Sequence, residues 1–160
     1  MIYENWISSQ KISKLLDIHD PFLFINRARL FKDDLVSGAQ SEYIVDSSHW
    51  IFKSHMRSKP VFPGVLLGEC LCQTAMIDLY SRSESEMNRG LLRSIDFTFI
   101  SKVTCEAGPV TMMAVATLVS IKRGISTYSL HLDDCNSGKR IAQGSICHVI
   151  PFISGMIKNE

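Results

Sequence analysis

The pattern of apolar and polar positions divides this 160-residue chain into one apolar central segment and several strand-like flanking segments. Residues 64–81 (GVLLGECLCQTAMIDLYS) are almost wholly apolar, which is typical of a helix in the middle of a core. Residues 9–16 (SQKISKLL) predict a short amphipathic helix with Ser8 or Ser9 as its N-cap. Runs rich in β-branched and aromatic residues predict strands. These runs cover residues 21–31, 35–45, 90–100, 108–121, 125–133 and 139–151.

The order of these segments predicts the architecture. Two strands, one long helix and four further strands are typical of an α+β domain, in which an antiparallel sheet of about five or six strands curls around one buried helix. Arg123-Gly124 and Asn136-Ser137-Gly138 predict hairpin turns between consecutive strands. No internal repeat or long Pro/Gly/Ser linker interrupts the sequence, so residues 1–160 are interpreted as a single domain. Such a sheet has exposed edges, and pairing with a second copy would cover one of them.

Composition and charge argue against several classes of function. The formal net charge is +1, so neither nucleic acid nor a membrane surface is the expected partner. No apolar run approaches the roughly 20 residues that span a bilayer, and the N-terminus lacks the features of a secretion signal. The five cysteines form no disulfide framework, which favours reduced thiols in the cytoplasm. Cys70 and Cys72 lack the partners of a zinc site, and a role as small core residues is the simpler interpretation.

The stretch from His55 to Glu69 (HMRSKPVFPGVLLGE) carries the chemistry that the sequence offers. It places an imidazole on a proline-bounded loop, turns at Pro63-Gly64 and then enters the apolar helix. A lone carboxylate in such a helix is costly unless it is hydrogen-bonded or used. A histidine and a partly buried carboxyl form the smallest acid–base pair that works near neutral pH. Taken singly, His55 could be an ordinary loop histidine, and Glu69 a core carboxyl that accepts backbone hydrogen bonds.

These residues, together with several other segments, resemble a known family: the hot-dog-fold β-hydroxyacyl-acyl-carrier-protein dehydratases of bacterial type II fatty-acid synthesis (the FabZ group). LLDIHDPFLFINR, at residues 15–27, is similar to that family's N-terminal segment. HMRSKPVFPGVL is similar to its His-Phe-Pro-Gly-x-Pro-x-x-Pro-Gly-Val-Leu motif. Glu69 falls at the family's catalytic Glu, and Gln73 at a Gln that follows one turn later. The resemblance covers residues 12–149 and implies a hot-dog fold.

The resemblance also implies an activity, the dehydration of a β-hydroxyacyl thioester to the trans-2-enoyl thioester. His55 would remove the α-proton, and Glu69 would hold the β-hydroxyl and deliver its proton. The backbone N–H of Gly64, at the helix N-terminus, would polarise the thioester carbonyl. In the resembling family, the His and the Glu of one site come from different subunits of a dimer. A substrate tunnel would pass beside the central helix, and its predicted lining is Phe62, Leu66, Gln73 and Phe97.

Partners follow from the same resemblance. The acyl group would arrive on the phosphopantetheine of acyl carrier protein, so no separate cofactor and no metal is expected. Lys53, Arg57 and Lys59 flank His55 and predict a basic rim that docks an acidic carrier, although an ordinary solvated loop explains them equally well. A homodimer is expected, with a trimer of dimers or a heterodimer with a related subunit as alternatives. The expected location is the cytoplasm.

The chain departs from the family motif around the histidine. Ser54 replaces the usual Gly before it, and Met56-Arg57-Ser58 replaces Phe-Pro-Gly after it. These changes touch the turn that holds His55 and favour a specialised branch, such as polyketide or polyene assembly. Two other functions stay open: a hot-dog thioesterase, in which a carboxylate or its activated water attacks the thioester, and a non-catalytic subunit that completes a heterodimer. The order of His, loop and Glu opposes the first, and the retention of both His55 and Glu69 opposes the second.

Overall fold

The computed structural model describes residues 1–82 and 90–150. Ser83, near the predicted end of the central helix, and position 151, at the end of the last predicted strand, lie outside the described residues. Within them, the chain forms an eight-stranded antiparallel sheet, one long helix and one short helix, which confirms the predicted α+β class. The elements are β1 (Ile2–Tyr3), β2 (Ile7–Ser8), α1 (Ser9–Leu16), β3 (Arg27–Lys32), β4 (Ser37–Val45), a 3-10 helix (Trp50–Lys53), α2 (Gly64–Ser81), β5 (Leu91–Phe99), β6 (Val110–Lys122), β7 (Ile125–Asp134) and β8 (Arg140–Val149).

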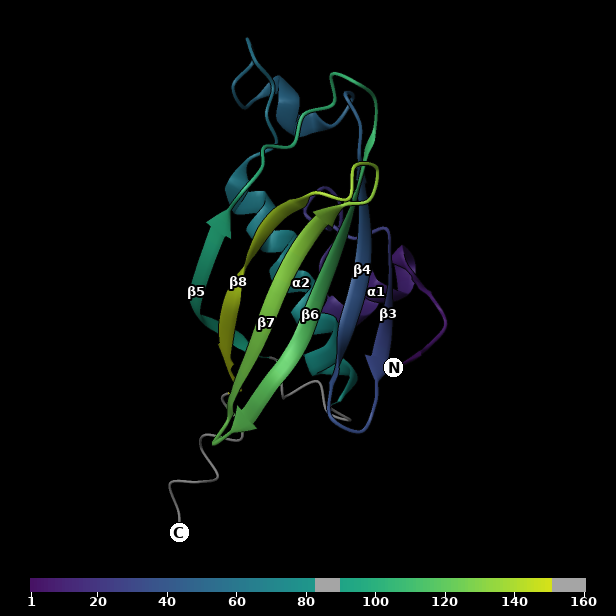
Figure 1. The fold of residues 1–160 in the computed structure, drawn as a ribbon, viewed down its shortest axis with the longest axis vertical. Helices are drawn as coiled ribbons and strands as arrows, with labels where there is room; N and C mark the ends of the chain where they lie inside the picture. Colours follow the sequence, from purple (N-terminus) through teal and green to yellow (C-terminus); the bar gives the residue numbers. More distant parts are fainter. Residues whose placement is uncertain (83–89, 151–160) are drawn as a thin grey trace.

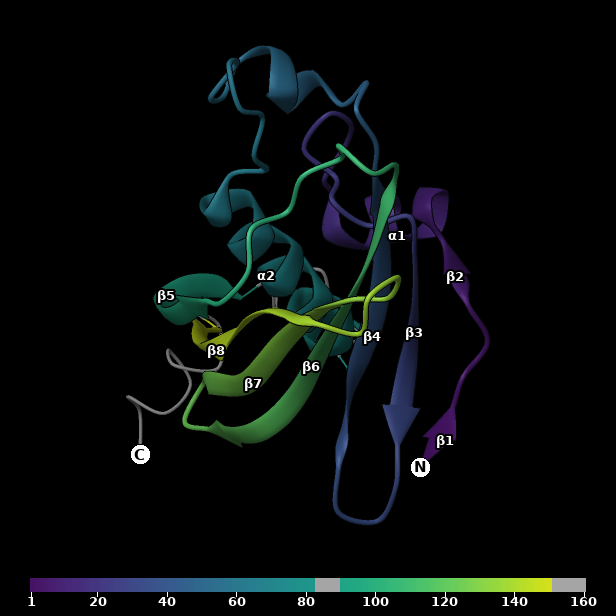
Figure 2. The ribbon, with the colours of Figure 1, turned by 45° about the horizontal axis from the view of Figure 1, so that its top comes forward.

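The sheet curves around α2, which lies along its inner face (Figures 1 and 2). The predicted helix over residues 64–81 agrees with α2 at both ends. Twelve residues of α2 are buried, on every side of the helix, because the sheet covers one side while α1 and neighbouring segments cover others. Strands β6 and β7 bury alternate residues against it, among them Met112, Ala114, Tyr128 and Leu130. Burial of this apolar helix is therefore the main contribution to the core.

The predicted hairpins are present. β6 pairs with β7, and β7 pairs with β8, both antiparallel. Between β6 and β7, Arg123 and Gly124 have φ values of 51° and 72°, as a two-residue turn of the right twist requires. Gly138, at φ 70°, ends the turn before β8. These local turn signals explain why the described residues 108–150 could be divided correctly from the sequence.

The prediction is wrong at the N-terminal side of the sheet. The first predicted strand, at residues 21–31, begins only at Arg27, because the Phe24 N–H donates to the Gln73 side chain instead of a neighbouring strand. Two further strands, β1 and β2, pair with β3 and raise the count above the predicted five or six. Each of them is two residues long, which is too short to produce an alternating pattern of its own.

Strand β5 forms the opposite edge of the sheet. The strand order is β1-β3-β4-β6-β7-β8-β5, and β5 pairs with β8 alone among the described strands. All of its residues except Phe97 are exposed, and the exposed set includes Leu91, 64% exposed, and Ile95, 50% exposed. A long apolar strand with one free edge is a ready template for pairing with another chain.

Candidate active site

His55 lies on the loop that joins β4 to α2. This loop projects beyond the end of the sheet (Figure 2). The 3-10 helix at residues 50–53 leads into this loop, and the His55 N–H donates a 2.8 Å hydrogen bond to the Ile51 carbonyl oxygen. His55 Nδ1 lies 2.9 Å from the Val61 carbonyl oxygen. Because a carbonyl oxygen only accepts, Nδ1 carries the proton and Nε2 keeps a lone pair. The neutral ring therefore offers a base at Nε2.

The residues that depart from the family motif fit this turn to different degrees. Ser54 has φ −119°, a conformation open to any residue, so the absence of Gly there does not prevent the turn. Met56 has φ 48°, in the left-handed region, where a side chain costs roughly 1 kcal/mol or more. The Lys59 N–H donates a 2.9 Å hydrogen bond to the Met56 carbonyl oxygen and closes the turn. His55 thus has a defined orientation beside a strained residue.

Glu69 lies on α2 and is held by the residue one turn later. Gln73 Nε2 donates to Glu69 Oε1 at 2.9 Å. Gln73 is fully buried: its Oε1 accepts the Phe24 N–H at 2.9 Å, and its Nε2 also donates to the Phe22 carbonyl oxygen at 2.8 Å. These bonds fix the amide and, through it, Glu69 Oε1. Within the described part of the chain, Glu69 Oε2 has no hydrogen-bond partner, so this half-buried carboxyl has one oxygen available for a ligand.

The first turn of α2 presents free backbone donors close to Glu69. Pro63 is the N-cap, and its carbonyl oxygen accepts hydrogen bonds from the N–H groups of Leu66 and Leu67. The Gly64 N–H has no acceptor among residues 1–82 and 90–150. Free N–H groups at a helix N-terminus, together with the helix dipole, favour a negatively charged oxygen. The predicted polarising role of Gly64 therefore has a suitable geometry.

Two aromatic rings of β5 cover this part of α2. A Cβ built on Gly64 would lie 3.5 Å from the Phe99 ring, and one built on Gly68 would lie 3.1 Å from the Phe97 ring. A Cβ on Gly144 of β8 would approach the Phe97 ring to 2.7 Å. The Phe97 ring therefore packs between two glycines, and a larger side chain at either position would push it aside. As a result, the exposed edge strand β5 lies directly against the turn that carries Glu69.

His55 and Glu69 are not joined in a single chain: no hydrogen bond or ion pair connects the two side chains within the described residues. The other residues predicted for the tunnel occupy different surroundings. Phe62 is buried in a cluster of aromatic rings, Leu66 packs partly buried against the core, and Gln73 has no exposed surface. Gln73 contacts Glu69 directly, and the Phe97 ring packs against Gly68, the residue before Glu69. A tunnel lined by these residues stays a prediction.

The side chains around the candidate site argue against other chemistry there. Burial raises the pKa of both Cys70 and Cys72 to about 12, so neither thiol next to Glu69 is a thiolate near neutral pH. All five cysteines are free thiols. In the part of the chain that the structure describes, no three His, Cys, Asp or Glu side chains gather as a metal would require. No helix of that part has the length and apolarity to cross a bilayer.

The three basic residues of the predicted rim, Lys53, Arg57 and Lys59, are all exposed.

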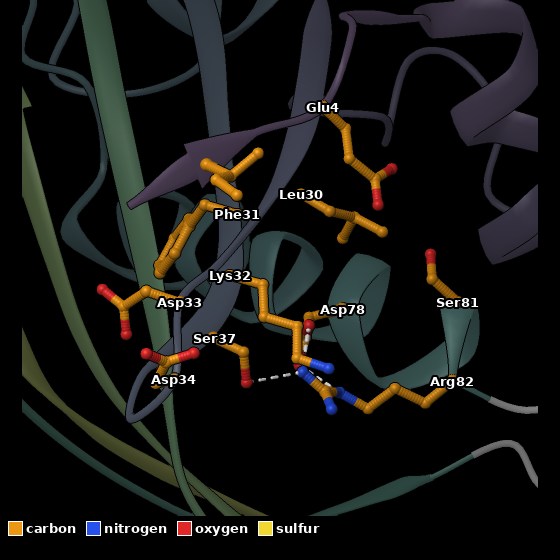
Figure 3. A pocket seen from close by; sticks show the side chains of 11 residues that line it. Glu4, Leu30, Phe31, Lys32, Asp33, Asp34, Ser37, Asp78, Ser81 and Arg82 are labelled. Atoms are coloured by element: carbon orange, nitrogen blue, oxygen red, sulfur yellow. Dashed lines mark hydrogen bonds and ion pairs between the residues drawn. The ribbon is translucent and has the colours of Figure 1, made fainter.

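A second polar cluster lies at the other end of α2 (Figure 3). Asp78, which is buried, accepts hydrogen bonds from Arg82 Nε at 2.8 Å and Arg82 Nη2 at 2.7 Å. The hydroxyl of Tyr128 donates to the same carboxylate at 2.8 Å, and Arg82 Nη2 also donates to Ser37 Oγ at 2.9 Å. Burial and the neighbouring Asp78 raise the pKa of Tyr128, and Asp78 raises the pKa of Arg82. This cluster borders a cleft of about 480 Å³ that also contains Lys32.

Two residues that hold the beginning of the His55 loop were not identified from the sequence. Tyr43, on β4, and His49, just before the 3-10 helix, are hydrogen-bonded to each other at 2.8 Å between the tyrosine oxygen and Nε2. Position 49 has one sequence signal, since it precedes a short apolar run (WIFK) as a helix cap does. Tyr43 has none, because it reads as one more inward-facing strand residue.

Comparison with known proteins identifies the family. Residues 18–143 match the FabA-like domain, and the chain therefore belongs to the FabA-like domain family. A 3-hydroxyacyl-[acyl-carrier-protein] dehydratase FabZ of Buchnera aphidicola is 33% identical over 87 residues, which are 54% of this chain and 56% of the relative. The FabZ of Chloroflexus aggregans is 28% identical over 119 residues, 74% of this chain and 80% of the relative. The match thus spans a little over half of the Buchnera protein's length.

Solved structures confirm the fold. The zebra fish thioesterase superfamily member 2 superposes with a TM-score of 0.61 at 15% identity, covering 88% of this chain and 94% of that one. A hypothetical thioesterase protein from Streptococcus pneumoniae, determined with coenzyme A, gives 0.55 at 10% identity and covers 77% and 84%. At these identities the likeness is one of fold, and it agrees with the hot-dog fold that the family resemblance predicted.

Proposed function

We propose that this protein removes water from a β-hydroxyacyl thioester carried on acyl carrier protein and produces the trans-2-enoyl thioester. The observation that carries the proposal is the state of Glu69. Its Oε1 is fixed by the buried Gln73, whereas its Oε2 is free among the described residues, and Glu69 lies five residues after Gly64, whose N–H is also free among them. A fully buried structural carboxyl would have both oxygens satisfied, whereas the half-buried Glu69 keeps one oxygen open to a ligand. Membership of the FabA-like family and the FabZ relatives support the same reaction.

The first step is removal of the α-proton. His55 Nε2 takes this proton, because Nδ1–H is occupied by the Val61 carbonyl oxygen and holds the ring in one tautomer. The electron pair of the broken C–H bond moves toward the thioester carbonyl. The Gly64 N–H, at the positive end of α2, stabilises the oxygen on which negative charge develops.

The second step is loss of the hydroxyl group. Protonated Glu69 donates to the β-hydroxyl oxygen as the C–O bond breaks, so water leaves and the C=C bond forms. His55 ends with the α-proton and Glu69 as a carboxylate. A proton returns from His55 to Glu69 through water before the next turnover, which restores both groups.

A homodimer would complete the site. The free apolar edge of β5 favours pairing with a second copy, and the rings of Phe97 and Phe99 place that edge against the first turns of α2. A partner joined there would bring its own residues next to Glu69. This arrangement agrees with the lack of a direct His55–Glu69 contact within one chain. We therefore propose that each site combines His55 of one protomer with Glu69 of the other.

The exposed cations around His55 support delivery by an acidic carrier. Lys53, Arg57 and Lys59 surround the loop and would steer such a protein toward the site. The FabZ relatives, whose names include the acyl carrier protein, suggest the same partner. We further propose that the protein acts in the cytoplasm, on a fatty-acid chain or on the chain of a specialised polyketide or polyene pathway.

Mass spectrometry of a β-hydroxyacyl group attached to acyl carrier protein tests the proposal. Incubation with the purified chain should convert the substrate to a product lighter by one water. His55→Ala and Glu69→Gln should both stop this conversion, whereas His131→Ala, a matched change on β7, should leave it unchanged. An unchanged substrate mass with the wild-type chain alone would refute the proposal as stated.

Two other functions give different results in the same experiment. A thioesterase, the function named for the fold neighbours, would release a free acid and leave no enoyl product on the carrier. A non-catalytic subunit would be inactive alone and would acquire activity only with a related partner. Both rank below the dehydratase, because the FabZ relatives carry that activity in their names and the order of His55, loop and Glu69 opposes a thioesterase.

A further inference from the structure

The loop that carries His55 is anchored to the sheet at one point near its beginning. His49 is the N-cap of the 3-10 helix, and its Nδ1 accepts the Ile51 N–H at 3.3 Å. On the other side of the ring, Nε2 lies 2.8 Å from the hydroxyl oxygen of Tyr43. The Ile51 carbonyl oxygen in turn accepts the His55 N–H at 2.8 Å. A continuous path of hydrogen bonds, through the His49 ring and the backbone of Ile51, thus joins β4 to His55.

These contacts define the tautomer of His49. Since Nδ1 accepts from a backbone N–H, it carries no proton, and the neutral ring must be protonated at Nε2. Nε2–H therefore donates to the oxygen of Tyr43. Burial lowers the pKa of His49, while Asp46 opposes this effect, so the neutral form that makes both bonds is favoured near neutral pH.

Tyr43 is a rigid anchor for this bond. It is buried on β4, with its ring edge-on to Phe24 at 5.6 Å between ring centroids and in contact with Phe62 at 6.4 Å. The His49 ring lies across the same cluster, 5.4 Å from Phe62 and perpendicular to Tyr43. Since packed aromatic rings have few alternative rotamers, the tyrosine hydroxyl is fixed relative to the sheet.

The loop needs such an anchor because it contains strain. Met56, immediately after His55, has φ 48°, and a non-glycine residue keeps that conformation only when its surroundings enforce it. The bond from His55 Nδ1 to Val61 restrains the loop on the downstream side. On the upstream side, the Tyr43–His49 pair adds to the restraint from the buried side chains of Ile51 and Phe52.

We infer that Tyr43 and His49 form a positioning pair, which holds the backbone at His55 so that Nε2 meets the substrate. The expected effect on dehydration rests on the proposed function, whereas the expected effect on the His55 backbone does not. Neither residue touches the reacting atoms in this account. Each acts through the 3-10 helix and the Ile51 carbonyl oxygen.

The test measures hydrogen exchange at the Ser54 and His55 amides together with the kinetics of dehydration. Tyr43→Phe and His49→Ala should each raise the exchange rate of both amides about tenfold, as expected for the loss of one buried hydrogen bond. They should lower kcat about tenfold or more and change KM little, because the base is misplaced while the binding surfaces remain. His49→Asn should behave like Tyr43→Phe and exchange no faster than His49→Ala, since an Asn cap can still accept the Ile51 N–H but loses the bond to Tyr43.

A matched control separates positioning from general loss of stability. Tyr128→Phe removes another buried tyrosine hydroxyl, whose bond to Asp78 lies at the far end of α2. It should destabilise the fold at least as much, yet leave kcat and the His55 amide unchanged. The inference is overturned if Tyr43→Phe and His49→Ala leave exchange at His55 unchanged, or behave like Tyr128→Phe. Faster exchange in a protein that never dehydrates any substrate would refute the proposed function and keep the positioning pair.

Discussion

The two ends of α2 each carry a carboxylate, and the two are satisfied in opposite ways. At the C-terminal end, both oxygens of Asp78 accept hydrogen bonds from Arg82 (Figure 3), and the Tyr128 hydroxyl donates a third. At the N-terminal end, Glu69 has a single hydrogen bond, from Gln73, and one oxygen without a partner among the described residues. Both residues lie on the same apolar helix, nine positions apart.

This difference distinguishes Asp78, which stabilises the fold, from Glu69, which we propose takes part in the reaction. Asp78 and Arg82 form a closed network that links α2 to β7 and, through Ser37, to β4. Removal of one member would leave the others buried without partners. Glu69 is instead fixed at one oxygen and, among the described residues, free at the other, on the helix whose first residue, Gly64, has a free N–H. Incomplete satisfaction, with the geometry still held by a buried neighbour, is what indicates a working group.

The largest expected effect concerns the N-terminal end. Glu69→Gln keeps the shape of the side chain and its contact with Gln73 but removes the acid, so dehydration should fall at least about 100-fold. His55→Ala should lower the dehydration rate by a similar factor, because it removes the base. Steady-state kinetics with a β-hydroxyacyl carrier substrate measures the loss, and circular dichroism checks that both variants are folded. Turnover within twofold of wild type in either variant would contradict the site assignment.

A second prediction concerns the pH dependence of stability. It depends on a buried group near the C-terminal end of α2 that lacks hydrogen-bond partners among the described residues. Both ring nitrogens of His148 are without hydrogen bonds in the described residues, and burial lowers its pKa from 6.5 to about 4. Because the pKa of His148 is lower in the folded protein, the unfolded chain binds the proton at a higher pH than the folded one. The contribution of the neutral His148 to the free energy of unfolding is therefore fully present above pH 6.5 and is lost as pH falls toward 4. At 1.36 kcal/mol per pH unit, the loss is about 3 kcal/mol.

Chemical denaturation at several pH values measures this effect. His148→Leu should flatten the dependence between pH 6.5 and pH 4, leaving the smaller contributions of His49 and His131, whose pKa values are also lowered by burial. An equally steep dependence in the His148→Leu protein would show that another group controls it.

A third prediction tests the structural role of Asp78. Asp78→Asn should lower the free energy of unfolding by about 2 kcal/mol, because Arg82 and Tyr128 lose a charged acceptor that is itself buried. The value is moderate because the Arg82 side chain is 36% exposed and partly solvated. Urea denaturation gives the change, and the folded fraction should dehydrate at the wild-type rate. Glu69→Gln, in the same denaturation experiment, should change stability by less than about 1 kcal/mol.

The smallest expected effect concerns the basic rim at the N-terminal end. Combined charge reversal at Arg57 and Lys59 should raise KM for the carrier-linked substrate severalfold and leave KM for a short pantetheine substrate nearly unchanged. Lys122→Glu, at the far end of β6, provides a control with the same change of sign. Equal effects on the two substrates would mean that the rim does not bind the carrier.

The sequence predicted much of this comparison, and physical reasons explain what it left out. The apolar run of α2 and the turn at Arg123-Gly124 are local signals, and both were predicted correctly. The His55–Glu69 spacing is also a local signal, and the site that it indicates stays a prediction. The Asp78–Tyr128 contact joins α2 to a strand 50 residues further along the chain, and no local pattern records it. Tyr43 and His49 are only six residues apart, but the pattern does not show that the chain turns so that their side chains meet. The same holds for Phe24, whose N–H turns to Gln73 and delays the start of β3.

The most direct test of a shared site is complementation between two inactive variants. His55→Ala and Glu69→Gln chains are unfolded together, refolded as a mixture and assayed with a β-hydroxyacyl carrier substrate. If His55 and Glu69 act across two protomers, half of the dimers are mixed and each has one intact site, so activity should return to about a quarter of the wild-type value. A mixture that refolds into mixed dimers and remains as inactive as each variant alone would contradict the account.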